Sequence, residues 1–426
     1  MRRSAQLLRC SFTVVLLLLI GTLASRAQTP PTPAGKPKIE SITFFLNLDR
    51  AEYQGQIADA YKSLRFAQTI FESRGYTVLH LRIATQPFPA YTRDLALADA
   101  VKFFQELDAL AAKDNVQISI GPAMYHVHDS ETQAELLATI LLNTKFLSGS
   151  VMVADKDGLH ANAARATARV MQKLSEGTPH SEGNLRFAAL AMVGPLTPSF
   201  PAAYVDGFGH QFAISEQSGN LVATIVNGAP DNETAKHRVT EALAAEAYEI
   251  DDHAGRVDGE TGWAYVGMDV SPAPSKDDSI GAALEGLSGH QAGSAEAVAA
   301  ARTLAAAIHD VSLRQTGFGG VPLPILEDRR LAQRWSEGRM GIDTLLDYFS
   351  AGSTGLDAVP LPGDVSGSQL ELIIVNGASQ AYRARKPMII QLLPVAGKTA
   401  GERTEFADPL LVNVTLQPLN YPRAKQ

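Results

Sequence analysis

The sequence predicts an α/β fold in which a parallel sheet closes into a barrel surrounded by helices. Short β-rich runs alternate with helical patterns along most of the 426-residue chain. This alternation is typical of a parallel sheet covered by helices. It is repeated many times with no convincing linker after Lys38, which favours a closed barrel over a small open sheet. A doubly wound sheet with a small appended domain is the alternative.

The first half of the chain gives the most regular alternation. Residues 41–46 (SITFFL) form a strand candidate, and in 51–73 apolar residues recur at helical spacing until Gly75 ends the helix. The strands predicted next are 77–83, 116–120, 148–154 and 187–192, and the helices between them are 96–112, 132–142 and 161–174.

In the second half the helices are richer in alanine. Strands are predicted at 263–270 and 389–394. Helices are predicted at 233–248, 280–287, 295–308 and 342–349. No internal repeat period is visible, which excludes a solenoid.

The amino terminus has the features of a secretory signal. Positive charge comes from Arg2, Arg3 and Arg9, and residues 14–20 are an unbroken apolar block. Small residues in 25–27 allow cleavage before Gln28. The block is shorter than the roughly 20 residues of a spanning helix, although an uncleaved anchor is the alternative. We therefore expect a signal peptide at 1–27 and an exported protein, periplasmic or extracellular.

Composition limits the remaining chain to a few classes of protein. Residues 28–38 form a proline-rich linker, and 39–421 are expected to be a single α/β barrel domain. The only cysteine, Cys10, lies in the signal, so the mature chain has no disulfide, thiolate ligand or cysteine nucleophile. The net charge of -8 without a basic run argues against nucleic acid as a partner. No later segment is apolar enough to enter a membrane.

The turn after the strand predicted at 263–270 is the strongest candidate for a site. It carries Asp269 and Ser271 and leads to Asp278 and Ser279 at the start of the next helix. Polar groups at the carboxyl end of a strand, facing the amino end of a helix, are how α/β proteins build ligand sites. The structural alternative is helix capping by Asp278 or Ser279, worth about 1 kcal/mol.

Histidines and carboxylates elsewhere supply further candidates. His210 with Glu216 could form an acid–base pair, because a histidine near a carboxylate titrates close to neutral pH. A structural histidine flanked by core aromatics is the alternative. His180 and Asn184 lie between a helix end and an apolar run, where they could face a cavity or form a plain turn.

Two further residues, His290 and Asp357, fit polar positions at strand ends, or could be ordinary turn residues. His126 and His128 are a weak metal candidate, since histidines at i and i+2 of an extended segment point the same way. Loop polar residues are the alternative there. There is no dinucleotide fingerprint, Gly-x-Ser-x-Gly elbow or zinc-protease helix, so any cofactor is unknown.

Several motifs, in order along nearly the whole mature chain, together resemble a known family. They are Asn47-Leu48-Asp49-Arg50, Gly183-Asn184 before 188–192, the turn 269–274 with Asp278-Ser279, Gly319-Gly320 before 322–327, and Gly355-Leu356-Asp357 before Val359-Pro360. The chain resembles the uncharacterised DUF family numbered seven-eleven. The resemblance implies a pyruvate formate-lyase-like barrel of about ten strands around a central cavity, without an assigned reaction.

The chain departs from that fold's glycyl-radical enzymes and from typical cytoplasmic members of the family. The mature chain has no cysteine, and 364–426 contain no radical-bearing glycine motif, so glycyl-radical chemistry is excluded. The signal peptide argues against an intracellular substrate.

These observations lead to one main functional hypothesis and two alternatives. The main hypothesis is an exported enzyme of hydrolase or lyase type, acting on a small polar molecule at the barrel mouth. The alternatives are a non-catalytic small-molecule binding protein and a metal-dependent hydrolase using His126 and His128. The acid–base residues expected are Asp269, His210 and His290. The ligand-binding residues expected are His180, Asn184, Glu216, Ser271, Asp278, Ser279 and Asp357. The oligomeric state is left open.

Overall fold

The computed structural model describes residues 36–422, which contain a mixed sheet of ten strands. The strands are β1 (Lys38–Leu46), β2 (Val78–Thr85), β3 (Gln117–Pro122), β4 (Leu147–Asp155), β5 (Gly158–Leu159), β6 (Phe187–Ala191), β7 (Gln211–Gln217), β8 (Ala264–Asp269), β9 (Gly355–Pro362) and β10 (Met388–Val395). Their order is β8-β7-β1-β2-β3-β4-β6-β10-β9, with β5 paired to β4. The predicted signal at 1–27 lies outside the described residues.

The sheet runs in two directions. Neighbours β1, β2, β3, β4 and β6 are parallel to one another. The pair β7 and β8 on one side, and the pair β10 and β9 on the other, run antiparallel to that block. The α/β class is confirmed, but the expectation of a wholly parallel sheet is wrong.

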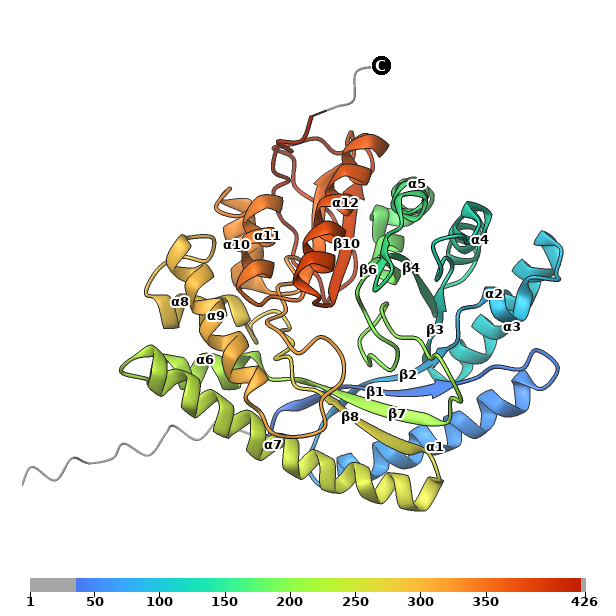
Figure 1. Cartoon of the computed structure of the whole chain (residues 1–426), viewed down its shortest axis with the longest axis horizontal. Coiled ribbons are helices and arrows are strands. Elements are labelled where there is room, and N and C mark those ends of the chain that lie inside the picture. The colour runs from blue at the N-terminus through green and yellow to red at the C-terminus, as the bar shows by residue number, and fades with distance from the viewer. Residues whose placement is uncertain (1–35, 423–426) are drawn as a thin grey trace, which may run out of the picture.

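Helices cover the outer face of the curved sheet, while loops fill its inner side (Figure 1). The longer helices are α1 (Tyr53–Ser73), α3 (Leu97–Asp114), α4 (Glu131–Leu142), α5 (Ala161–Gly177), α7 (Asn232–Thr261), α9 (Ala295–His309) and α12 (Gly367–Ala384). The shorter ones are α2 (Pro89–Thr92), η1 (Pro179–Arg186), α6 (Gly219–Asn227), α8 (Ile280–Ser288), α10 (Arg329–Ser336) and α11 (Ile342–Ala351). No helix within residues 36–422 has the length and hydropathy to cross a membrane.

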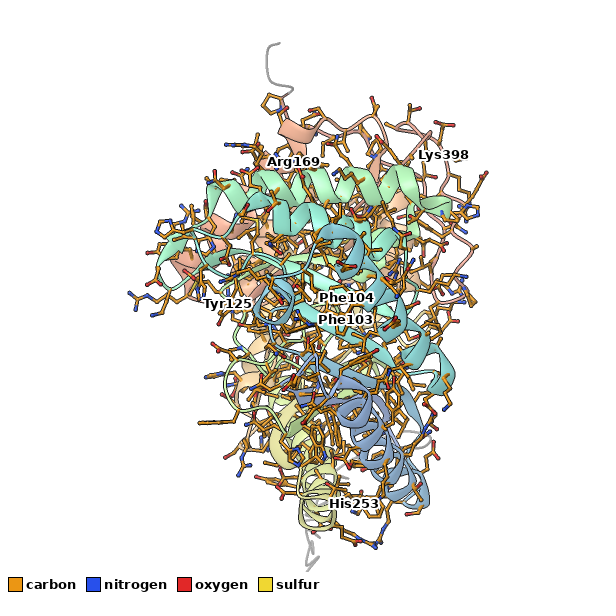
Figure 2. The ribbon with its side chains drawn as sticks, turned by 90° about the vertical axis from the view of Figure 1, so that its right-hand side faces the viewer. Phe103, Phe104, Tyr125, Arg169, His253 and Lys398 are labelled. Carbon is orange, nitrogen blue, oxygen red and sulfur yellow. The ribbon has the colours of Figure 1, made fainter. Side chains whose placement is uncertain are left out.

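Apolar residues at helical spacing fix the outer layer to the sheet. In α3, Phe103 and Phe104 point inward with their ring centroids 5.2 Å apart (Figure 2). Phe104 meets Phe88 edge-on at 5.5 Å between centroids. Aromatic pairs in this geometry are worth about 0.5–1.5 kcal/mol beyond the area they bury. The outer face thus supplies the main core.

The expected closure of the sheet into a barrel is wrong. The edge strands β8 and β9 do not pair with each other. Residues 314–327, here called the strap, cross the opening between them. The Thr316 N–H donates to the Met268 carbonyl of β8 at 2.9 Å, and the Thr354 N–H beside β9 donates to Val321 at 3.1 Å. The strap is rich in glycine and contains two prolines, which cannot donate to a ladder, so it does not form an eleventh strand.

A second segment, residues 193–206 (the inner loop), lies against the concave face of the sheet. The Thr43 hydroxyl of β1 donates to the Pro198 carbonyl at 2.8 Å, and the Ser119 hydroxyl of β3 donates to Ala203 at 2.7 Å. The strap joins it through Thr316, whose hydroxyl donates to Leu196 at 2.8 Å. These contacts explain why strands with apolar outer residues carry small hydroxyl residues on the inner side.

Candidate functional site

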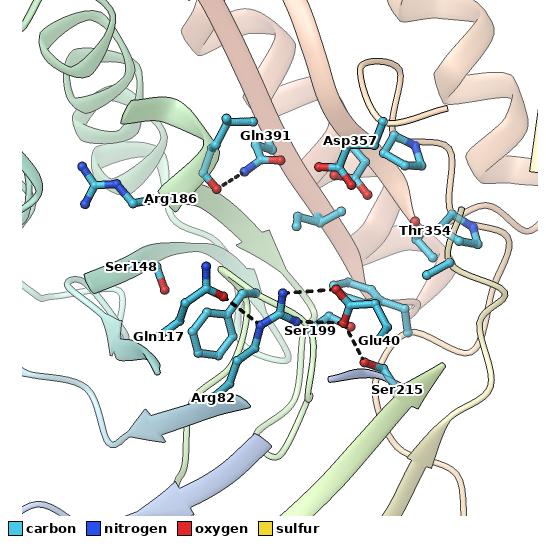
Figure 3. A pocket seen from close by; sticks show the side chains of 18 of the residues that line it. Glu40, Arg82, Gln117, Ser148, Arg186, Ser199, Ser215, Thr354, Asp357 and Gln391 are labelled. Atoms are coloured by element: carbon cyan, nitrogen blue, oxygen red, sulfur yellow. Dashed lines mark hydrogen bonds and ion pairs between the residues drawn. The ribbon is translucent and has the colours of Figure 1, made fainter. Parts of the chain in front are cut away.

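A cavity of about 230 Å³ lies on the concave side of the sheet, bordered by the strap and the inner loop. It is formed by the amino-terminal parts of β1, β3 and β4, by Arg82 near the middle of β2, and by the carboxyl-terminal parts of β7 and β8, which run opposite to β1. Its polar lining residues include Glu40, Arg82, Gln117, Lys145, Ser148, Arg186, Ser215, Asp269, Ser271, Glu327, Thr354, Asp357 and Gln391 (Figure 3).

An ion pair between Glu40 and Arg82 forms one wall. A register shift at Glu40, in the pairing of β1 with β7, is a bulge of the kind that re-aims a side chain. The guanidinium donates to the carboxylate at 3.0 and 3.2 Å and to Gln117 at 3.1 Å, and the Ser215 hydroxyl donates to Glu40 at 3.1 Å. Burial opposes ionisation of Glu40, but these partners outweigh it and hold its pKa below the usual range.

Two carboxyl groups, those of Glu327 and Asp357, lie on the opposite side. Glu327 ends the strap and Asp357 belongs to β9, where the Ile325 N–H donates to the Asp357 carbonyl at 3.1 Å and fixes the two segments together. Burial raises the pKa of both groups, and the charge of Asp357 raises the pKa of Glu327 further. Because two close carboxylates resist ionising together, the pair retains one proton near neutral pH.

Two buried hydroxyls in the cavity wall have no hydrogen-bond partner among the described residues. They belong to Ser148 and Thr354, which are 5% and 3% exposed. Buried polar groups in proteins nearly always have a partner, so an orphan in a cavity wall marks a position where a ligand or water binds. Ser148 and Thr354 lie on opposite sides of the cavity (Figure 3).

Asp269 and Ser271 border the cavity and hold the strap. The Asp269 carboxylate accepts from the N–H groups of Ser271 at 3.0 Å, Phe318 at 2.9 Å and Gly319 at 3.4 Å. The Ser271 hydroxyl accepts from the Gly320 N–H at 3.1 Å. Burial raises the pKa of Asp269, and these donors oppose the rise. These hydrogen bonds occupy most of the acceptor positions of the Asp269 carboxylate. The catalytic role expected for Asp269 is not tested by this geometry and stays a prediction.

The residues that follow this turn have structural partners outside the cavity. Ser279 caps α8 by accepting from the Ala282 N–H at 3.0 Å, which confirms the capping alternative, and its hydroxyl donates to Asp328 at 2.7 Å. Asp278 accepts from the side chain of Gln217 at 2.6 Å and from the Asn220 N–H.

Removing the cap of α8 should weaken the fold without touching the cavity. We expect Ser279→Ala to lower the free energy of unfolding by about 1–2 kcal/mol, because both the cap and a partner of buried Asp328 are lost. Urea unfolding measures this difference. An exposed serine, Ser368→Ala, is the control, and equal stability of the two variants would contradict the assignment.

Three predicted histidines lie on the surface and do not line the cavity. His210 is stacked on Trp263, with ring centroids 4.1 Å apart. The Nδ1–H of His290 donates to the Ser288 carbonyl at 2.9 Å. His180 is exposed in η1 with a positive φ of 52°. The structure therefore does not bring these three side chains together with Asp269.

Two other predicted residues are fully buried away from the cavity. Asn184 donates to the Met171 carbonyl at 3.0 Å. Glu216 accepts from the Ser218 hydroxyl at 2.8 Å, and its second oxygen has no partner among the described residues. Burial, together with the charges of Glu246 and Asp269, raises the pKa of Glu216 to about 8.

The expected extended geometry of His126 and His128 is wrong. Both are exposed on a turn, which forms because the Asp129 carboxylate accepts from the N–H groups of Tyr125 and His126, each at 2.8 Å. Within residues 36–422 no group of three or more His, Cys, Asp or Glu side chains could hold a metal.

Sequence reasoning found Asp269, Ser271 and Asp357 in the cavity wall but missed Glu40, Arg82 and Glu327. A signal was present for the first two, because charged residues inside the β-rich runs IESITF and LHLRIA must be paired if they are buried. Glu327 had no such signal, since its position depends on how the strap crosses the sheet.

Comparison with known proteins places the chain in a family. The model of the family described as "Uncharacterised ACR (DUF711)" matches residues 35–411. A UPF0210 protein of Pyrobaculum arsenaticum is 27% identical over 410 residues, covering 91% of this chain and 89% of that protein. One from Oenococcus oeni is 25% identical, covering 84% and 83%. Among solved structures, the anaerobic ribonucleotide reductase from Thermotoga maritima has 11% identity and a TM-score of 0.35, covering 88% of this chain and 79% of that one. With the family model spanning most of its length, the chain belongs to the uncharacterised DUF711 family.

Proposed function

We propose that this protein is an acid–base enzyme, of hydrolase or lyase type, that acts on a small polar molecule inside the cavity. The observation that carries the proposal is the Glu327–Asp357 pair, two carboxyl groups with raised pKa values in one enclosed site. When the environments of two titratable groups separate their pKa values, one group is protonated and the other ionised near neutral pH. Enzymes use such pairs as a general acid and a general base.

The geometry suggests which carboxyl group has which role. The charge of Asp357 adds to burial at Glu327, so Glu327 retains the proton and serves as the general acid. Asp357 ionises first and serves as the general base. The Glu40–Arg82 ion pair, in which the pKa of Glu40 is lowered, orients the substrate instead. The hydroxyls of Ser148 and Thr354 bind its polar groups.

The experiment is a search for a metabolite that the protein consumes. Purified protein is incubated with a metabolite extract, and untargeted mass spectrometry compares wild type with Glu327→Gln and Asp357→Asn. We expect consumption of one compound to fall at least about 100-fold in either variant. The wild-type rate should peak near neutral pH, rising as Asp357 ionises and falling as Glu327 loses its proton.

Exposed carboxylates on α7 provide matched controls, Glu241→Gln and Asp252→Asn. Thermal unfolding shows whether each variant is folded. The enzyme proposal fails if the folded wild-type protein consumes no compound, or consumes only compounds that the cavity variants consume equally fast. Binding of a compound without its consumption would favour a non-catalytic binding protein.

We also propose that the protein is exported, on the strength of its amino-terminal sequence. Expressed with its full sequence in a bacterial host, it should be recovered outside the cytoplasm with Gln28 as its first residue, as read by intact mass. Ala27→Leu removes the small residue before the cleavage site and should leave the longer chain. Wild-type protein found in the cytosol with residues 1–27 attached would contradict export.

A further inference from the structure

The surroundings of the Glu327–Asp357 pair are acidic. The charges that act most strongly on Glu327 are those of the carboxyl groups of Asp357, Glu40 and Asp408 and that of one cation, Arg82, which opposes them. Arg82 is already bonded to Glu40 through both terminal nitrogens, so these two charges largely cancel at Glu327. The groups that act most strongly on Glu327 therefore leave no net positive charge to balance the carboxyl pair.

The cations of the cavity wall lie elsewhere. The guanidinium of Arg186 donates to the carbonyls of Leu141 at 2.7 Å and Leu147 at 2.9 Å, on the side away from Asp357 (Figure 3). Lys145 is exposed and also lines the cavity. Neither is among the groups whose charge acts most strongly on Glu327 or Asp357.

An unused hydroxyl gives a second, independent indication of a ligand at this end. Thr354 immediately precedes β9, which carries Asp357, and its hydroxyl is buried in the cavity wall without a partner. The side-chain amide of Gln391 donates its hydrogens to the carbonyls of Asn184 and Leu185 at 3.2 and 2.9 Å, which leaves its oxygen as an acceptor. Acceptors thus predominate over free donors around the carboxyl pair.

We infer that the cavity binds a small organic molecule through a primary ammonium group, held by Glu327 and Asp357 with Thr354 as a further acceptor. This rests on the ligand site of the proposed function and names the class of ligand, but it departs from the acid role proposed for Glu327, because a bound ammonium takes the place of the proton of the carboxyl pair. An ammonium carries three donors and a positive charge, which is what this end of the cavity lacks. The orphan hydroxyl of Ser148 on the far wall binds a second polar group of the same ligand.

Charge balance gives the inference a specific signature. The carboxyl pair holds one proton near neutral pH, and an ammonium between the two groups favours ionisation of both. Binding therefore releases one proton to solvent. A neutral hydroxyl compound in the same place leaves the proton on the pair. Where one proton is released, the dissociation constant should fall tenfold for each unit of rising pH.

Isothermal titration calorimetry of the full protein tests this with two matched pairs of probes, ethanolamine against ethylene glycol and putrescine against butanediol. We expect each amine to bind at least ten times more tightly than its diol at pH 7. Titrations in two buffers of different ionisation heat should show about one proton released per amine. Glu327→Gln should abolish the proton release. Thr354→Val should weaken amine binding but leave the number of protons released unchanged.

Equal affinity for an amine and its diol, or binding without proton release, would overturn the inference. So would failure of both amines to bind, or displacement of a bound amine by magnesium or calcium alone at equal concentration. Amine binding with no metabolite consumed supports the ammonium site and counts against the enzyme. Consumption of a neutral compound, lost in Asp357→Asn, without amine binding supports the enzyme and counts against the ammonium site.

Discussion

Asp269→Ala should lower the free energy of unfolding by about 3–5 kcal/mol. The carboxylate is 2% exposed and accepts from three backbone N–H groups, those of Ser271, Phe318 and Gly319. Alanine leaves these donors unpaired in the interior, and each unmet donor costs about 1–3 kcal/mol. The loss exceeds what a typical substitution produces because the strap loses the side-chain anchor that Asp269 provides and keeps only its backbone hydrogen bonds to Met268 of β8.

Chemical unfolding measures the change in stability, and amide hydrogen exchange shows whether the N–H groups of Phe318 and Gly319 lose protection. Asp277→Ala is the matched control from the same turn. Asp277 is exposed, and its ion pair with Arg329 is screened by solvent and contributes little to stability. If Asp269→Ala were as stable as the control, the carboxylate would not be holding the strap, and its predicted catalytic role would regain support.

A second large effect is expected at Glu216, and it depends on pH. Burial raises the pKa of this carboxyl from 4.5 to about 8 in the folded protein. The folded state thus binds a proton that the unfolded state releases above pH 4.5. Stability is highest below the unfolded pKa, falls as pH rises toward 8, and is constant above it. At 1.36 kcal/mol per pKa unit the total loss is roughly 3–5 kcal/mol.

Glu216→Gln should remove this loss. Relative to wild type, the variant should become more stable as the pH rises from 5 to 8.5. Urea unfolding of both proteins at a series of pH values would measure this difference in unfolding free energy. Glu241→Gln, on the exposed face of α7, controls for the change in net charge. A difference that stays constant across that range would mean that Glu216 does not hold its proton in the folded state.

Local patterns were enough to predict much of the fold. Strand and helix positions such as 41–46 and 295–308 coincide with β1 and α9, because period and composition are local properties. The helix α12 is not among the predicted helices, although Ser366 and Gln369 form a capping box that marks its start. Strand β9 is not among the predicted strands, and Asp357 is expected at a strand end or in a turn, because Gly355 and Asp357 are residues that turns favour.

Strand direction could not be predicted in the same way, and this decided the site. The turn after β8 was correctly placed at a cavity, since Asp269 and Ser271 line it. The partners supplied by β1 and β2 do not lie at the carboxyl ends of those strands, since Glu40 is the third residue of β1 and Arg82 lies near the middle of β2. The rule that sites form at carboxyl ends of parallel strands did not apply, because β7 and β8 run opposite to β1.

The strap has a further consequence for the solubility of the protein. A sheet that ends in two open strands exposes unpaired N–H and C=O groups, to which a strand of another molecule can pair and start aggregation. Residues 314–327 occupy both edges at once, bonding to Met268 on β8 and to Asp357 on β9. Pro322 and Pro324 have no backbone N–H, so the strap itself lacks a continuous row of hydrogen-bond donors. The strap therefore covers the two sheet edges without presenting a new regular edge. The segment that carries Glu327 into the cavity thereby also protects the sheet against self-association.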